Sequence, residues 1–285
     1  MTPYHDAHLH FHFAELHPHH AVIAADLERI GLQHGVVNGT HEEEWPLIAE
    51  LAQKYPWLLP SYGVHPWDCG QRSPLWQQRL RHAIATDPRA GIGEIGLDRW
   101  IIDGIRPDDP RIAGLRVAPL SEQIEVFAWQ IALAAEFNRV ASIHATQAYG
   151  AALEALRTAP RLPARGFLMH GYAGPVELIP AFADLGAYFS FNLELLTPRR
   201  SARATLFTQI PTNRLLVETD APVKAPAPAL NRFPLGQASD GTTLNHPANI
   251  TVAYDALATL RHLPLEQLAH VVTENFQRLF INLPA

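Results

Sequence analysis

Cysteine is almost absent from the chain, and so are long apolar runs. The one cysteine, Cys69, cannot form an intramolecular disulfide, which is typical of proteins in a reducing compartment. The sequence contains no run near the ~18 consecutive apolar residues that a membrane-spanning helix needs. It does not open on a charged segment followed by an apolar one, as a secretory signal does. We therefore expect a cytoplasmic protein with no membrane partner.

Positive charge is also scarce: Lys and Arg total 22 against 28 Asp and Glu, and the formal net charge is -6. This balance argues against the broad basic surface with which proteins bind long duplexes regardless of sequence. An anionic substrate remains compatible with it, because bound cations can dominate the potential inside one pocket. Nothing in the sequence indicates an obligate protein partner.

Apolar residues are plentiful, at 47% of 285 residues, which suffices for one large domain over residues 1–285. Short apolar runs recur at the spacing of a strand plus a return helix, and segments 120–135 and 268–279 have helical periodicity. This rhythm predicts a (β/α)8 barrel. An open doubly wound sheet is the alternative, but a glycine-rich turn should then follow the first strand. The markers of the eight runs are His8, Thr40, His65, Glu94, His144, His170, Asn192 and Asp220.

Two connections, 98–119 and 223–247, are too long for simple turns. They follow the expected fourth and eighth strands, so they should emerge at the face where barrel enzymes keep their active sites. They could cover a substrate or be tolerated surface insertions. Stacking of a terminal base on Trp100 or Tyr172 is conceivable, although Tyr172 is expected to be a packed core residue.

Histidine is concentrated in the opening segment, PYHDAHLHFHF, where alternation would place Asp6, His8, His10 and His12 on one face of a strand. Glu94 lies among isoleucines and glycines, where an ionised carboxylate without a partner is costly. Such a mixed nitrogen and oxygen set suits divalent ions, and one shared carboxylate can hold two ions ~4 Å apart. The residues expected at one barrel mouth are His8, His10, Glu94, His144, His170 and Asp220.

The chain resembles the TatD family of metal-dependent hydrolases, within the amidohydrolase-like barrels. The matching motifs are DAHLH (6–10), GVHP (63–66), GEIGLD (93–98), IHA (143–145), HGYAG (170–174), ETDAP (218–222), NHP (245–247) and ENFQRLF (274–280). The resemblance implies two divalent metal ions, Zn, Mn or Mg. One would be held by His8, His10, Glu94 and Asp220, with Glu94 bridging to a second ion held by His144 and His170.

The resemblance also implies roles in catalysis. Asp220 would accept the proton of the attacking water, and Glu94 would be catalytic as the bridging ligand. His65, expected in the third strand, would bind substrate or shape the His-Pro turn. Glu218 would line the substrate pocket or support a ligand.

The implied activity is hydrolysis of phosphodiester bonds, as by a 3'-end-directed deoxyribonuclease that acts on nucleic acid ends or short oligonucleotides. An amidohydrolase for a small ester, lactone or amide is the alternative, weakened because Glu94 stands where such enzymes often carry a carbamylated lysine. A barrel that binds metal without turnover is a third possibility.

The chain departs from the family pattern at two places. Thr146 and Gln147 replace an arginine and an aspartate, and His246 replaces an acid. If the missing arginine contacts phosphate, another cation must substitute, and the candidates are Lys224, Arg199 and Arg232.

Overall fold

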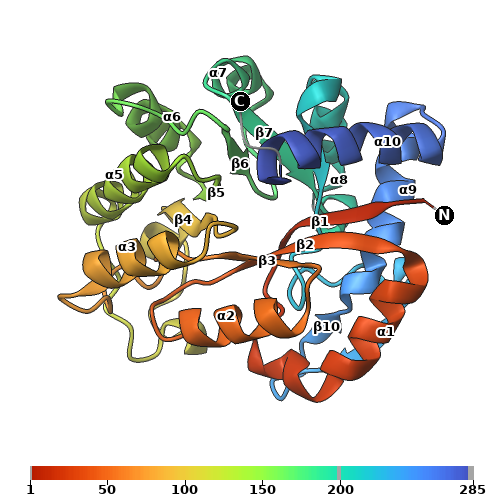
Figure 1. The fold of residues 1–285 in the computed structure, drawn as a ribbon, viewed down its shortest axis with the longest axis horizontal. Coiled ribbons are helices and arrows are strands. Elements are labelled where there is room, and N and C mark those ends of the chain that lie inside the picture. The colour runs from red at the N-terminus through yellow and green to blue at the C-terminus, as the bar shows by residue number, and fades with distance from the viewer. Residues whose placement is uncertain (1, 198–199, 282–285) are drawn as a thin grey trace.

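The computed structural model describes residues 2–197 and 200–281, and within them eight parallel strands form the inner layer (Figure 1). The strands pair in chain order as two sheets, β1-β2-β3 and β4 to β8. Their bounds are β1 Tyr4–Leu9, β2 Leu32–Asn38, β3 Leu58–Ser61, β4 Ile92–Asp98, β5 Ala141–Thr146, β6 Phe167–Met169, β7 Ala187–Phe191 and β8 Leu215–Val217.

Backbone hydrogen bonds outside these ladders join the two sheets at both seams. Between β3 and β4, Gly93 N–H donates to the Tyr62 carbonyl at 3.1 Å. Between β8 and β1, Asp220 N–H donates to the His8 carbonyl at 3.0 Å, and His10 N–H donates to Ala221 at 2.7 Å. The strands therefore follow one another around a ring, which confirms the predicted α/β barrel.

Helices surround the strands (Figure 1), and the two segments with helical periodicity are indeed helical. The helices are α1 His20–Ile30, α2 Trp45–Lys54, α3 Trp76–Thr86, α4 Trp100–Asp103, α5 Leu120–Phe137, α6 Tyr149–Thr158, α7 Ile179–Asp184, α8 Ser201–Ala204, α9 Ile250–Arg261 and α10 Leu265–Phe276. Within the described residues, none is long and apolar enough to cross a membrane.

Both long connections follow the carboxyl ends of strands, as predicted. The connection after β4 contains α4 and a 3-10 turn, Pro110–Ile112. The connection after β8 contains an antiparallel hairpin of β9, Pro234–Gln237, and β10, Thr243–Asn245. Because parallel strands present their carboxyl ends at one face, both connections border the mouth of the barrel.

Gly96 allows β4 to approach β5 closely. Its φ is 142°, and a Cβ added there would overlap the His144 carbonyl oxygen. We expect Gly96→Ala to cost about 3 kcal/mol in the free energy of unfolding, measured in urea. The control is Gly150→Ala in α6, where nothing lies within 4 Å of an added Cβ. Equal stability of the two variants would contradict the close approach.

His5 is buried on the side of β1 that packs against α10. Its ring stacks on Phe276 of α10 at a centroid distance of 4.4 Å and on His34 at 5.5 Å. Neither ring nitrogen of His5 has a hydrogen-bond partner. Burial, together with the neighbouring His34, lowers the pKa of His5 to about 3.

This buried imidazole should weaken the fold in acid. Below pH 6.5 His5 is protonated in the unfolded chain, whereas in the folded chain it stays neutral until about pH 3. The free energy of unfolding therefore falls as the pH falls. The cost reaches about 2 kcal/mol at pH 5. We expect His5→Phe to keep the stacking and to lose that much less stability between pH 7 and pH 5 in urea unfolding. An unchanged acid loss would show that His5 does not contribute to it.

Candidate metal centre at the mouth of the barrel

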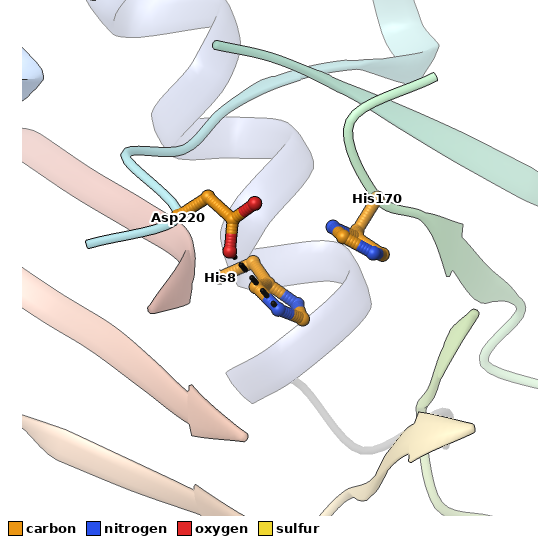
Figure 2. Close-up of side chains that lie close together, drawn as sticks. All are labelled: His8, His170 and Asp220. Carbon is orange, nitrogen blue, oxygen red and sulfur yellow. Dashed lines mark ion pairs between the residues drawn. The ribbon is translucent and has the colours of Figure 1, made fainter. Parts of the chain in front are cut away.

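The predicted side chains come from five strands and converge at the carboxyl ends. His8 lies in β1, Glu94 in β4 and His144 in β5. His170 directly follows β6, and Asp220 lies in the loop after β8. Figure 2 shows His8, His170 and Asp220 pointing toward one another from these three elements.

One group of ligand atoms surrounds Oε2 of Glu94. The Nε2 atoms of His8 and His10 lie 3.3 Å apart, and each is 3.4 Å from Glu94 Oε2. Asp220 Oδ1 lies 3.4 Å from His10 Nε2 and 3.9 Å from His8 Nε2. Ligand atoms ~2.1 Å from a tetrahedral zinc lie ~3.4 Å from one another. The spacing therefore fits one divalent ion.

A second group surrounds the other oxygen of Glu94. Glu94 Oε1 lies 2.8 Å from His170 Nε2 and 2.9 Å from His144 Nδ1, and these nitrogens are 3.2 Å apart. The two oxygens of one carboxylate thus face two different sets of imidazoles. Among the described residues, three overlapping trios have ligand atoms within 4.8 Å of one another: His8, His170 and Asp220; His8, His10 and Glu94; His65, Glu94 and His144.

The far nitrogens of the β1 histidines are held by hydrogen bonds that suit metal ligation. His10 Nδ1 lies 2.8 Å from the Asn38 carbonyl oxygen, which can only accept, so the proton is on Nδ1. His8 Nδ1 lies 3.0 Å from the Ser142 hydroxyl. His10 Nε2 then presents a lone pair to the first group, as a metal-binding imidazole must, and His8 Nε2 does the same when His8 Nδ1 donates to the Ser142 hydroxyl.

His65 joins the second group, although the prediction that it lies in the third strand is wrong. β3 ends at Ser61, and His65 occupies the loop that follows. Its Nε2 lies 3.4 Å from Glu94 Oε1, and its ring meets His144 edge-on at 4.5 Å. Its carbonyl also accepts the Asp68 N–H at 2.9 Å, which forms the turn. Both expected roles, at the substrate and in the turn, are compatible with this position.

Two acidic residues lie behind the histidines of the second group. Glu218 is fully buried, with Oε1 3.6 Å from His170 Nδ1, and it accepts hydrogen bonds from Asn192 and Ser190. Asp98 Oδ2 lies 3.1 Å from His144 Nε2. No sequence pattern predicts a role for Asp98, although it ends the GEIGLD motif. Such carboxylates orient metal-binding imidazoles.

The alternation predicted for the opening segment holds only in part. Asp6 points away from the histidine cluster and accepts hydrogen bonds from the Thr219 N–H, at 3.0 Å, and from the Thr219 hydroxyl. His12 Nε2 instead lies 3.1 Å from Glu44 Oε2. Of the four side chains, His8 and His10 alone lie in the cluster as the described residues show it.

The departures from the family pattern have structural counterparts. The Thr146 hydroxyl lies 3.0 Å from His144 Nε2, where it can help to hold the ring. His246 Nδ1 accepts the Ala248 N–H at 2.9 Å and so caps the next 3-10 turn.

The cations proposed to replace the missing arginine differ in their partners. Lys224 pairs with Glu194 at 2.9 Å, and Arg232 pairs with Asp255 at 2.6 Å on the exterior. Arg199 lies outside the described residues.

Both carboxylates of the centre are ionised despite their burial. Burial would raise the pKa of Glu94, but the neighbouring imidazoles of His170 and His65 hold it well below its usual value. Burial would also raise the pKa of Asp220, but the hydrogen bond with His10 and the neighbouring imidazole of His8 bring it to about 2. The donor set is therefore anionic oxygen and imidazole nitrogen, which is the chemistry that divalent transition metals favour.

Comparison with known proteins finds metal-dependent hydrolases among the relatives of this chain. A family model described as TatD related DNase matches residues 5–281. The chain is 27% identical over 232 residues to the Bacillus subtilis protein named uncharacterized metal-dependent hydrolase YabD, covering 81% of this chain and 80% of that protein. It is 26% identical over 281 residues to the Escherichia coli protein named uncharacterized metal-dependent hydrolase YjjV, covering 98% of both.

The fold has a matching solved structure. The crystal structure of YjjV, described as a TatD homolog from Escherichia coli, superposes with a TM-score of 0.82 at 24% identity, covering 99% of this chain and 98% of that one. At that identity the structural match concerns the fold, whereas the family model spans nearly the whole sequence. The chain therefore belongs to the TatD related DNase family.

Proposed function

We propose that this metal-dependent hydrolase of the TatD family cleaves phosphodiester bonds, using two divalent ions of Zn, Mn or Mg. The observation that carries the proposal is the orientation of Glu94, whose two oxygens face two separate groups of imidazoles. The family's description as DNases supports nucleic acid as the substrate. The proposed ligands are His8, His10, Glu94, His144, His170 and Asp220.

The residues of the centre have different proposed roles in hydrolysis. Divalent ions at such a site polarise a phosphoryl oxygen and lower the pKa of water. Glu94 spaces the two groups, and Asp220, ionised at neutral pH, accepts a proton from the attacking water. His65, at the edge of the second group, is placed to contact the substrate. Two divalent cations would outweigh the two carboxylates and attract a phosphate.

The end-directed part of the proposal rests on access and charge. The connections after β4 and β8 border the mouth, and the chain carries a formal charge of -6. Both the connections and the negative charge would hinder the approach of a long duplex. A single strand end is narrow enough to enter the mouth between the two connections. We infer that single-stranded ends and short oligonucleotides are preferred.

One assay tests the proposal directly. A 3'-recessed duplex, a single strand and a closed circle of equal length are incubated with metal-loaded protein at one salt concentration, beside an aryl ester and an amide. We expect cleavage of the first two substrates, and cleavage at least about 10²-fold slower with Asp220→Asn protein purified in parallel, which controls for a contaminating nuclease. Rapid cleavage of the circle would exclude end-directed action, and turnover of the ester or amide alone would favour the amidohydrolase alternative.

A further inference from the structure

Two tryptophans from different connections stack beside the candidate centre. Trp67 lies in the loop after β3, and Trp100 begins α4 in the long connection after β4. Their ring centroids are 5.9 Å apart with an angle of 22° between the planes. Both side chains are only partly buried. The guanidinium of Arg111, from the same long connection, lies 5.0 Å above the Trp100 ring.

Hydrogen bonds join the stacked pair, Trp67 and Trp100, to the group of side chains around Glu94 Oε1. The Trp67 indole N–H donates to Asp98 Oδ2 at 2.8 Å, and the same oxygen lies 3.1 Å from His144 Nε2. The Trp67 backbone N–H donates to His65 Nδ1 at 3.2 Å. These hydrogen bonds fix the position of Trp67 next to His65 and, through Asp98, next to His144.

The outer face of Trp100 can be opened at little cost. Arg111 is exposed, with 57% of its side chain accessible, and its ion pair with Asp109 spans 2.7 Å at the surface. Exposed ion pairs of this kind contribute little to stability, so an incoming planar group can displace the guanidinium. Arg111 then remains nearby as a cation for a neighbouring phosphate.

We propose that Trp67, Trp100 and Arg111 form a stacking subsite for a nucleobase of the substrate, beside the phosphate held at the centre. The inference deepens the proposed nuclease function and rests on it. An aromatic face accepts every base, because stacking uses the π surface and no base-edge hydrogen bonds. The subsite thus selects substrates that carry a planar ring and is indifferent to base sequence.

A binding experiment tests the subsite without turnover. Metal-loaded protein is titrated calorimetrically with thymidine 5'-monophosphate and with deoxyribose 5-phosphate, which lacks the base. We expect the wild type to bind the nucleotide at least about tenfold more tightly. Trp100→Leu should reduce this preference to about onefold and leave the affinity for the sugar phosphate unchanged, and Trp100→Phe should retain part of it.

The matched control is Trp129→Leu on α5, because Trp129 is also partly buried and paired with another tryptophan, Trp76, at 4.8 Å. It should keep the full preference. Equal binding of the two ligands by the wild type, or a preference that survives Trp100→Leu, would overturn the subsite. Base preference without cleavage of any nucleic acid would overturn the nuclease function alone, and cleavage without base preference would overturn the subsite alone.

Discussion

Glu94→Gln is expected to bind about one divalent ion per chain where the wild type binds two, and to lose at least ~10³-fold in kcat/KM. The neutral amide offers a single oxygen, so it can no longer serve both groups with an anionic donor. Loss of the bridge also removes the negative charge that offsets two nearby cations. Elemental analysis after loading and desalting gives the ion count, and the single-strand assay gives the rate.

Glu44→Gln is the matched control, because Glu44 is partly buried and pairs with His12 at the same mouth. It should retain two ions and lose less than about tenfold in rate, as for other contacts remote from the reacting atoms. Two tightly bound ions in Glu94→Gln would contradict the bridging assignment. One ion in the wild type under every loading condition would contradict the two-ion centre.

Asp220→Asn is expected to slow hydrolysis by 10²–10⁴-fold, the usual contribution of a general base, with a smaller effect on the ion count. The amide oxygen can still face His10, but it cannot accept a proton at neutral pH. The pH profile should separate the roles. In the wild type the rate should fall in acid, and in the variant the residual rate should rise with hydroxide concentration.

Asp26→Asn is the matched control, because it makes the same Asp-to-Asn change outside the centre. Asp26 belongs to α1 and lies 3.3 Å from His246. Its rate and pH profile should match the wild type. An Asp220→Asn enzyme with a wild-type rate would assign the proton transfer to another group. Complete loss of bound metal in Asp220→Asn would show that Asp220 acts mainly as a metal ligand.

The sequence was most informative where a local pattern and a long-range constraint agree. The βα rhythm predicts the barrel because each apolar run must be buried on both faces, and all six residues of β1 are buried. Glu94 could be singled out because a carboxylate among isoleucines needs a cation. The convergence of six polar side chains from the ends of five strands then follows from the parallel arrangement.

Other features depend on where the chain turns. The alternation that included His12 fails because β1 ends at Leu9 and the chain folds back, with Phe13 N–H bonded to the His10 carbonyl at 3.0 Å. Asp98 ends β4 and meets Trp67 from the loop after β3, and no periodicity relates a strand end to a residue in another loop. The sequence predicts a strand at His65 because the apolar run around β3 does not show where strand pairing stops.

The seam between the last strand and the first sets the order in which the centre can form. His8 and His10 enter with β1, whereas Asp220 follows β8 and is held to β1 by its N–H bond to the His8 carbonyl. Bringing these residues together closes a chain loop of about two hundred residues, one of the slowest kinds of contact to form. During synthesis His8 and His10 therefore lack Asp220 until nearly the whole barrel has been made. Capture of an ion by the first group, as proposed above, would then be a late folding event that follows closure of the ring.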